Sequence, residues 1–310
     1  MMITIFNHTA SGLLTQDEIS AGCWINVVDP DAAEIARLQE LGIPPDFITY
    51  PLDMDEQART ERDDGATLIV VRIPFYQGDN YDVPYSTLPL GIILTDRLIL
   101  TICKRENEIV QGFSSGRMRD LSTAKRYRFV LRLLLRTAQS YLAYLREINK
   151  VVDALEDQLQ RSTRNKEVLE LLKYQKSLTY FTTALKSNEL LMERLQRMQV
   201  FKTYPEDEDL LEDVLIENRQ AIEMTNIASN ILSSMMDAFA SIISNNLNGV
   251  MKFLASVTIV LSLPTIVTGL WGMNVGVPLT NAGSAFLAIL GFIFLITLAT
   301  VFIFWKRDWF

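Results

Sequence analysis

The sequence predicts a membrane protein with an α/β domain first, a long helical region next and two transmembrane helices at the end. Three observations predict this class. Most charged residues lie before Val250, while almost all lipid-compatible sequence follows it. Two apolar runs near the end are each long enough to cross a bilayer. Between positions 117 and 204 there is neither glycine nor proline, which favours long helices.

Composition excludes several classes of function. The chain has 37 acidic and 29 basic residues among 310, a net charge of −8, which is opposite to the basic face that nucleic acid requires. It has no phosphate-binding loop motif for ATP, and a single histidine, His8, argues against histidine-based metal or triad chemistry. No nucleophile–base pair is visible, so we do not expect an enzyme.

Residues 1–115 predict a small sheet with helices on it, a cytoplasmic α/β domain. The β-rich runs are Ile3–Phe6, Cys23–Val28, Leu68–Ile73, Gly91–Thr95 and Leu98–Ile102. One helix between the second and third runs has readable ends. Asp29 is the predicted N-cap, Pro30 the first helical residue and Gly42 the stop signal.

Residues 116–204 predict a helical hairpin, because apolar residues recur there at spacings of three and four. The polar string Gln160–Lys166 is the expected turn. Residues 205–249 then predict a stalk helix, which begins with six acids in the eight residues Glu206–Asp213. Acids at a helix start complement the helix dipole, so a solvated first turn explains them too. A rod this long buries too little surface alone, which predicts self-association.

Two segments, 250–270 and 286–305, match the length of transmembrane helices. The loop between them, 271–285, carries no charge, whereas Lys252 lies at the start of the first segment and Lys306 lies in the tail, 306–310. By the positive-inside rule both termini lie in the cytoplasm and the loop lies outside.

The first span carries a stripe of mainly small or polar residues at helical spacing. Its members are Asn248, Met251, Ala255, Thr258, Ser262, Thr265 and Gly269. Polar side chains are costly against lipid, so the stripe fits the lining of a pore shared by several subunits. Small residues also favour close helix packing in membranes, and the residues alone leave both interpretations open.

The string Gly272-Met273-Asn274, directly after the first span, resembles the signature of the CorA family of magnesium channels. The resemblance extends through Asn248–Lys252 and the long stalk helix. It also includes the basic and aromatic C-terminus and Leu52–Arg59, which precedes a strand expected to end at Pro74. It therefore covers essentially the whole chain.

The resemblance implies a funnel-shaped homopentamer with a selectivity filter at Gly272, Met273 and Asn274. It implies a pore lined by Asn248, by a hydrophobic constriction at Met251 and Leu254, and by Thr258, Ser262, Thr265 and Gly269. It also implies a regulatory Mg²⁺ held between subunits by Asp213, with Asp79 and Asp82 as candidate partners.

The expected function is therefore Mg²⁺ uptake, with Co²⁺ and Ni²⁺ as further ions, through the plasma (inner) membrane and without ATP. Two other interpretations stay open. One is a relative of the same family that moves zinc or another transition metal. The other is a membrane-anchored coiled-coil scaffold, which leaves the filter string and the stripe unexplained.

Overall fold

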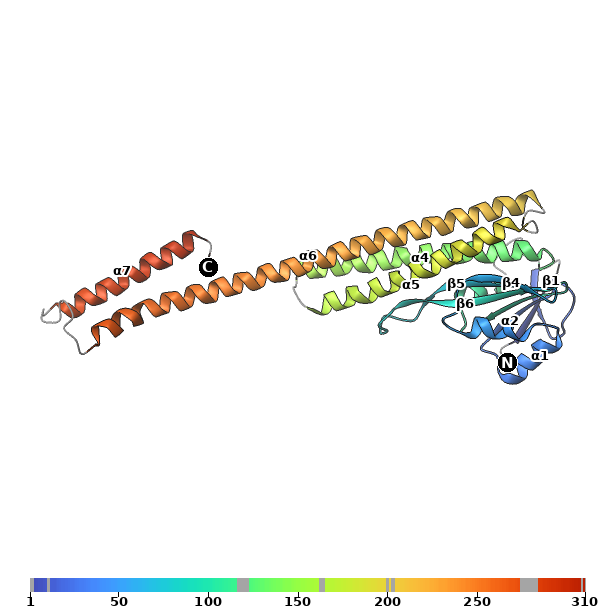
Figure 1. Ribbon diagram of the computed structural model, residues 1–310, viewed down its shortest axis with the longest axis horizontal. Coiled ribbons are helices and arrows are strands. Elements are labelled where there is room, and N and C mark those ends of the chain that lie inside the picture. Colours follow the sequence, from blue (N-terminus) through green and yellow to red (C-terminus); the bar gives the residue numbers. More distant parts are fainter. Residues whose placement is uncertain are drawn as a thin grey trace. The chain divides into compact units, whose positions relative to one another are not determined.

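The computed structural model describes residues 3–9, 12–115, 123–161, 165–198, 201, 204–273, 284–307 and 309. The chain divides into two compact units, Met1–Met236 and Asp237–Phe310. The first holds a sheet with helices on both faces, and the second holds two apolar helices (Figure 1).

A seven-stranded mixed sheet, in the order β2-β1-β3-β7-β6-β5-β4, organises the first unit. The strands are β1 (Ile3–Thr9), β2 (Gly12–Gln16), β3 (Trp24–Val28), β4 (Arg59–Asp63), β5 (Ala66–Tyr76), β6 (Tyr85–Leu94) and β7 (Ile99–Cys103). Among the strands that the structure describes, β3 and β7 pair in parallel and every other neighbouring pair is antiparallel. All five predicted strands are present, and β2 and β4 are additional.

Strand β5 continues past the predicted end at Pro74 to Tyr76. Its partner β4 pairs only with residues 66–70, whereas β6 accompanies β5 over its whole length from residue 67. Pro74 therefore lies where β5 has a strand on one side only. A proline is tolerated there because one side of the strand needs no ladder hydrogen bond.

Each face of the sheet has its own apolar core. On one face, Ile69, Val71 and Ile73 of β5 pack with residues of α3 (Glu108–Ser114), α4 (Arg126–Arg161), α5 (Asn165–Arg197) and the start of α6 (Pro205–Trp271). On the other, Leu68 and Val70 pack with α1 (Ala32–Glu40), α2 (Pro45–Thr49) and the short helix η1 (Tyr50–Leu52). Figure 1 shows α4 and α5 on one face and α1 and α2 on the other. The two cores are separate because successive side chains of β5 point to opposite faces of the sheet.

The predicted start of α1 was wrong by two residues. Asp31, not Asp29, is the N-cap: its Oδ1 accepts from the Glu34 amide at 2.8 Å, and Glu34 Oε2 accepts from the Asp31 amide at 3.1 Å. This reciprocal pair is a capping box, which Asp29 cannot form. Asp29 instead has φ 42° and forms an ion pair with Lys104. The stop at Gly42 is confirmed, with φ 79°.

The long helices agree closely with the sequence. The helix α4 ends at Arg161 and α5 begins at Asn165, and both of these positions lie inside the predicted string. The helix α6 begins at Pro205 and continues for 67 residues to Trp271 without a break, including Pro264. In the second unit, α7 (Ala285–Lys306) follows. The C-terminal part of α6 and α7 are both long and apolar enough to span a membrane.

Candidate functional site

The stripe on α6 faces outward. Ser262 is half-buried, and the other members of the stripe are exposed: Asn248, Met251, Ala255, Thr258, Thr265 and Gly269. The predicted constriction residue Leu254 is exposed as well. Ser256 and Val267, by contrast, are buried in the span. Side chains two positions apart on a helix differ in direction by about 200°. Thr258 therefore lies nearly opposite Ser256, and Thr265 lies nearly opposite Val267. The predicted stripe is thus separate from the buried face.

The hydroxyl groups of the stripe have a defined orientation. Thr258 Oγ1 donates to the Leu254 carbonyl at 2.8 Å, Ser262 Oγ to the Ile259 carbonyl at 2.9 Å and Thr265 Oγ1 to the Leu261 carbonyl at 3.2 Å. Each hydroxyl hydrogen is therefore engaged within the helix. The remaining lone pairs are acceptors, which suit the hydrogens of water molecules around a cation.

The filter string begins where α6 ends. The Gly272 amide still donates to the Thr268 carbonyl at 2.9 Å, so the helical hydrogen bonding extends to this residue. A side chain on Gly272 would lie 3.3 Å from the same carbonyl, a tight contact. Met273 is exposed, while Asn274 lies outside the described residues. The exposed end of the helix thus leads directly into the predicted filter.

The candidate regulatory residues lie on two elements. Asp213 is on the exposed side of α6, and Asp79 and Asp82 are exposed in the connection between β5 and β6. Asp79 Oδ1 accepts from the Tyr76 hydroxyl at 2.9 Å. In the described ranges no group of three acidic, histidine or cysteine side chains is placed to hold a metal ion. One chain therefore does not bring these three acids together as a metal site.

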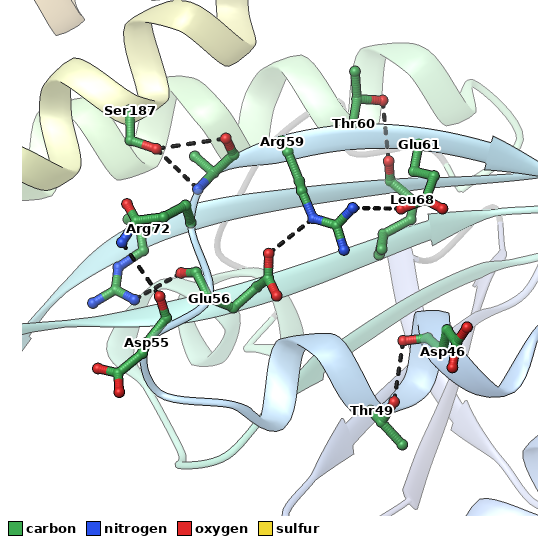
Figure 2. Close-up of polar contacts among 12 residues, drawn as sticks. Asp46, Thr49, Asp55, Glu56, Arg59, Thr60, Glu61, Leu68, Arg72 and Ser187 are labelled. Atoms are coloured by element: carbon green, nitrogen blue, oxygen red, sulfur yellow. Dashed lines mark hydrogen bonds and ion pairs between the residues drawn. The ribbon is translucent and has the colours of Figure 1, made fainter.

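A buried arginine that sequence reasoning missed fixes the acidic loop before β4. The Arg72 guanidinium on β5 points toward the loop that carries Asp55 and Glu56 (Figure 2). Its Nη1 donates to the carbonyls of Met54 at 2.7 Å and Glu56 at 2.8 Å. Its Nη2 and Nε donate to Thr87 of β6. These bonds occupy all five N–H donors, so none remains for an anion.

The backbone of Arg72 also joins the sheet to the helices that pack on it. The Arg72 backbone N–H donates to Asn188 Oδ1 at 2.9 Å, and its carbonyl accepts from Asn188 Nδ2 at 2.8 Å and from the Tyr141 hydroxyl at 3.0 Å. Ser187 Oγ accepts from the Ala58 amide at 2.9 Å (Figure 2). Burial lowers the pKa of Arg72. The signal in the sequence that could have revealed this buried arginine is a charged residue within the apolar run Leu68–Ile73.

These features define a class: an integral membrane protein with two apolar C-terminal helices and a folded α/β unit before them. A family model described as "CorA-like Mg2+ transporter protein" matches residues 20–307. The chain belongs to this family of divalent-cation transporters.

Similar proteins span the chain almost completely. The "Cobalt/magnesium transport protein CorA" of Methanocaldococcus jannaschii is 29% identical, and the match covers 99% of this chain and 100% of that protein. The complete structure of the CorA magnesium transporter from that organism has a TM-score of 0.86 at 25% identity, covering 100% of this chain and 99% of that one. The full-length CmaX protein shares the fold, with a TM-score of 0.73 at 17% identity and coverage of 100% and 98%.

Proposed function

We propose that several copies of this chain form a channel through which Mg²⁺ enters the cytoplasm. The observation that carries the proposal is the exposed polar stripe on α6, in which Thr258, Ser262 and Thr265 have already engaged their hydroxyl hydrogens. Such a face is costly against lipid and favourable against water. Family membership, and the cobalt and magnesium transport named for the Methanocaldococcus relative, support a divalent cation as the ion.

The channel is a homopentamer whose first spans surround the axis, because two helices from one chain cannot enclose a pore. Asn248 forms the inner polar ring. Met251 and Leu254, both exposed apolar residues, form a constriction that closes the pore by excluding water. Thr258, Ser262, Thr265 and Gly269 line the rest of the pathway. The resemblance to the family supports this assembly.

The filter is formed by Gly272, Met273 and Asn274 from each subunit. Mg²⁺ prefers octahedral oxygen ligands and releases its water reluctantly. Neutral amide oxygens accept hydrogen bonds from that water without removing it, and they hold the ion weakly enough for it to leave. Hydrated Co²⁺ and Ni²⁺ present the same outward hydrogens, so they are the further ions expected to pass.

Transport is driven by the membrane potential. The basic residues Lys252, Lys306 and Arg307 lie at the span ends away from the uncharged loop. The positive-inside rule supports an inner-membrane protein with both termini in the cytoplasm. A potential of 100 mV then supplies about 4.6 kcal/mol for each inward-moving dication. Inward flow needs no ATP.

Cytoplasmic Mg²⁺ regulates the channel by binding between subunits, to Asp213 of one and to Asp79 or Asp82 of the next. All three side chains are exposed, which leaves them available to a neighbouring copy. Loss of the ion leaves like charges facing each other across the interface, and their repulsion opens the pore.

Ion uptake by liposomes that contain the purified protein tests the transport proposal. The wild type and the Asn281→Ala variant, which changes another asparagine of the loop, should take up Mg²⁺ alike. The Asn274→Ala variant should lose most of this uptake or its preference for Mg²⁺ over other cations. Equal, equally selective uptake by both variants would contradict the filter assignment. No uptake by the wild type would favour the scaffold interpretation, and uptake of Zn²⁺ alone the transition-metal one.

Protease protection tests the regulatory proposal separately. Mg²⁺ should slow cleavage of the cytoplasmic part of the wild type and of the control Asp237→Ala, which removes another exposed acid of α6. The Asp213→Ala variant should need a higher Mg²⁺ concentration for the same protection. Unchanged protection of Asp213→Ala across a magnesium titration would show that this carboxylate is not a ligand.

A further inference from the structure

One arginine holds two of the six acids at the start of α6. Arg128, in the first turn of α4, donates from Nε to Asp207 Oδ1 at 2.5 Å and from Nη2 to Glu206 Oε2 at 2.7 Å. The side chain of Asp207 is only 6% exposed and that of Arg128 17%, whereas Glu206 is 74% exposed. A planar guanidinium is suited to such a two-pronged contact.

The arginine compensates for a charge that α6 buries. A carboxylate at 6% exposure is costly unless it is paired and hydrogen-bonded, and the Arg128 guanidinium provides both to Asp207. Hydrogen bonds to Asp207 and Glu206 raise the pKa of Arg128, and the bond from Arg128 lowers the pKa of Glu206. The guanidinium therefore does for these two acids what a bound cation would do.

The anchor continues from α4 into the sheet. Phe129, the next residue, is buried, with its ring centroid 5.2 Å from that of Trp24 on β3 and 5.4 Å from that of Phe113 on α3. Arg126 donates to the Thr95 carbonyl in the turn between β6 and β7. The first turn of α6 is thus tied through α4 to the core of the first unit.

We propose that Arg128 is a built-in cation that reserves Glu206 and Asp207 and so confines the response of the acidic segment to Mg²⁺ to carboxylates further along α6. The inference rests on the proposed regulation at Asp213 and deepens it. A site that holds Mg²⁺ through carboxylates needs negative charge that no neighbouring cation already balances. Arg128 engages the carboxylates of Glu206 and Asp207, while Asp213 lies exposed about two turns later.

Removing the arginine should therefore add a second magnesium response to the one that the wild type has at Asp213. In the full-length protein in detergent with EDTA, Arg128→Gln should lower Tm and speed cleavage near residue 205. Added Mg²⁺ should restore this loss by binding the released acids, so the magnesium-induced rise in Tm should be at least about twice that of the wild type. Arg128→Lys keeps the charge and should respond like the wild type.

Three further variants make the result specific. The triple variant Arg128→Gln, Glu206→Gln, Asp207→Asn should lose the extra response. Lys150→Gln breaks the exposed 2.8 Å ion pair with Glu147 on the same helix and should change nothing. Adding Asp213→Ala to Arg128→Gln should remove the wild-type part of the response and keep the extra part, which separates this inference from the regulatory proposal.

Two results would overturn the inference. If Arg128→Gln lowers Tm by the same amount at every Mg²⁺ concentration, the contact is only a structural salt bridge. If that variant does not fold, Glu206→Gln with Arg128 retained decides the question, because the exposed Glu206 tolerates substitution. This variant should keep the wild-type magnesium response, and loss of that response would show that Glu206 itself binds the ion.

Discussion

The two units of the chain place the same residue types in opposite environments. In the first unit large apolar side chains such as Phe129 and Phe181 are buried, and charged ones such as Asp213 are exposed. In the second unit Phe286, Leu287 and Trp305 are mostly exposed, on helices with hardly any charge. Water does not stabilise so much apolar surface, but a bilayer does. The surface of the first unit therefore suits water, whereas the apolar surface of the second unit suits the interior of a bilayer.

Polar groups follow the same division. In the first unit the buried polar side chains Arg72 and Asn188 meet hydrogen-bond partners inside the protein. In the second unit Thr258 and Thr265 lie on an exposed face and turn acceptors outward. Satisfied polar groups inside a domain specify its fold. Exposed ones on a membrane helix are costly against lipid, which supports the water-filled path proposed above.

The largest expected effect is in the first unit, at Arg72. The Arg72→Met variant should lower the free energy of unfolding by about 3–5 kcal/mol, because several buried acceptors lose their donor at about 1–3 kcal/mol each. Chemical denaturation of the full-length protein in detergent measures the change. Arg59→Gln is the matched control, because Arg59 pairs with Glu56 and Glu61 near the surface (Figure 2). It should cost less than about 1 kcal/mol, and equal losses would contradict the assigned role.

Two exposed leucines test the difference in solvent. Leu295 in the middle of α7 is 68% exposed and Leu169 on α5 is 60% exposed. Leu295→Arg should oppose membrane insertion by roughly 2.5–3.5 kcal/mol, while Leu169→Arg should leave it unchanged. The measurement is the fraction of each variant recovered in membranes after cell-free synthesis with vesicles. Equal recovery of the two variants would mean that α7 does not contact lipid.

The smallest expected effect is a loss of stability in acid at the start of α6. The Arg128 hydrogen bond lowers the pKa of Glu206 below its ordinary 4.5, and Lys125 adds to the shift. A carboxylate with a lowered pKa stabilises the folded state above its unfolded pKa, and this contribution disappears as the pH falls through the folded value. Cleavage near residue 205 should therefore be constant from pH 7 to about 5 and rise below about 4.5. Glu206→Gln should flatten the profile, and an unchanged profile would contradict this account.

The periodic parts of the fold could be predicted from the sequence. Apolar spacing and the absence of glycine and proline indicated α4, α5 and α6, and span length indicated α6 and α7. The strands β2 and β4 were missed because they lie at the two edges of the sheet, and Arg59–Asp63 carries charges at four of five positions. Asp29 and Asp31 lie on either side of the same proline. Only the glutamate three residues after Asp31 identifies Asp31 as the N-cap.

Less of the candidate site could be predicted. The stripe followed from helical spacing, and its role in lining a pore remains a prediction. The filter and regulatory residues remain predictions, and Asn274 lies outside the described residues. Arg72 and Arg128 were missed because their partners are far away in sequence: Asn188 is 116 positions from Arg72, and Asp207 is 79 from Arg128. No local pattern reports such contacts.

The central claim is that the stripe on α6 faces water in the assembled channel. The two native cysteines, Cys23 and Cys103, are buried, so the protein offers little background to a charged thiol reagent. Thr258→Cys should be modified quickly in liposomes, since water allows the thiolate to form, and the modification should block Mg²⁺ uptake. Leu295→Cys, exposed on α7, should react slowly and leave uptake intact. Equally slow modification of the two variants would contradict the claim.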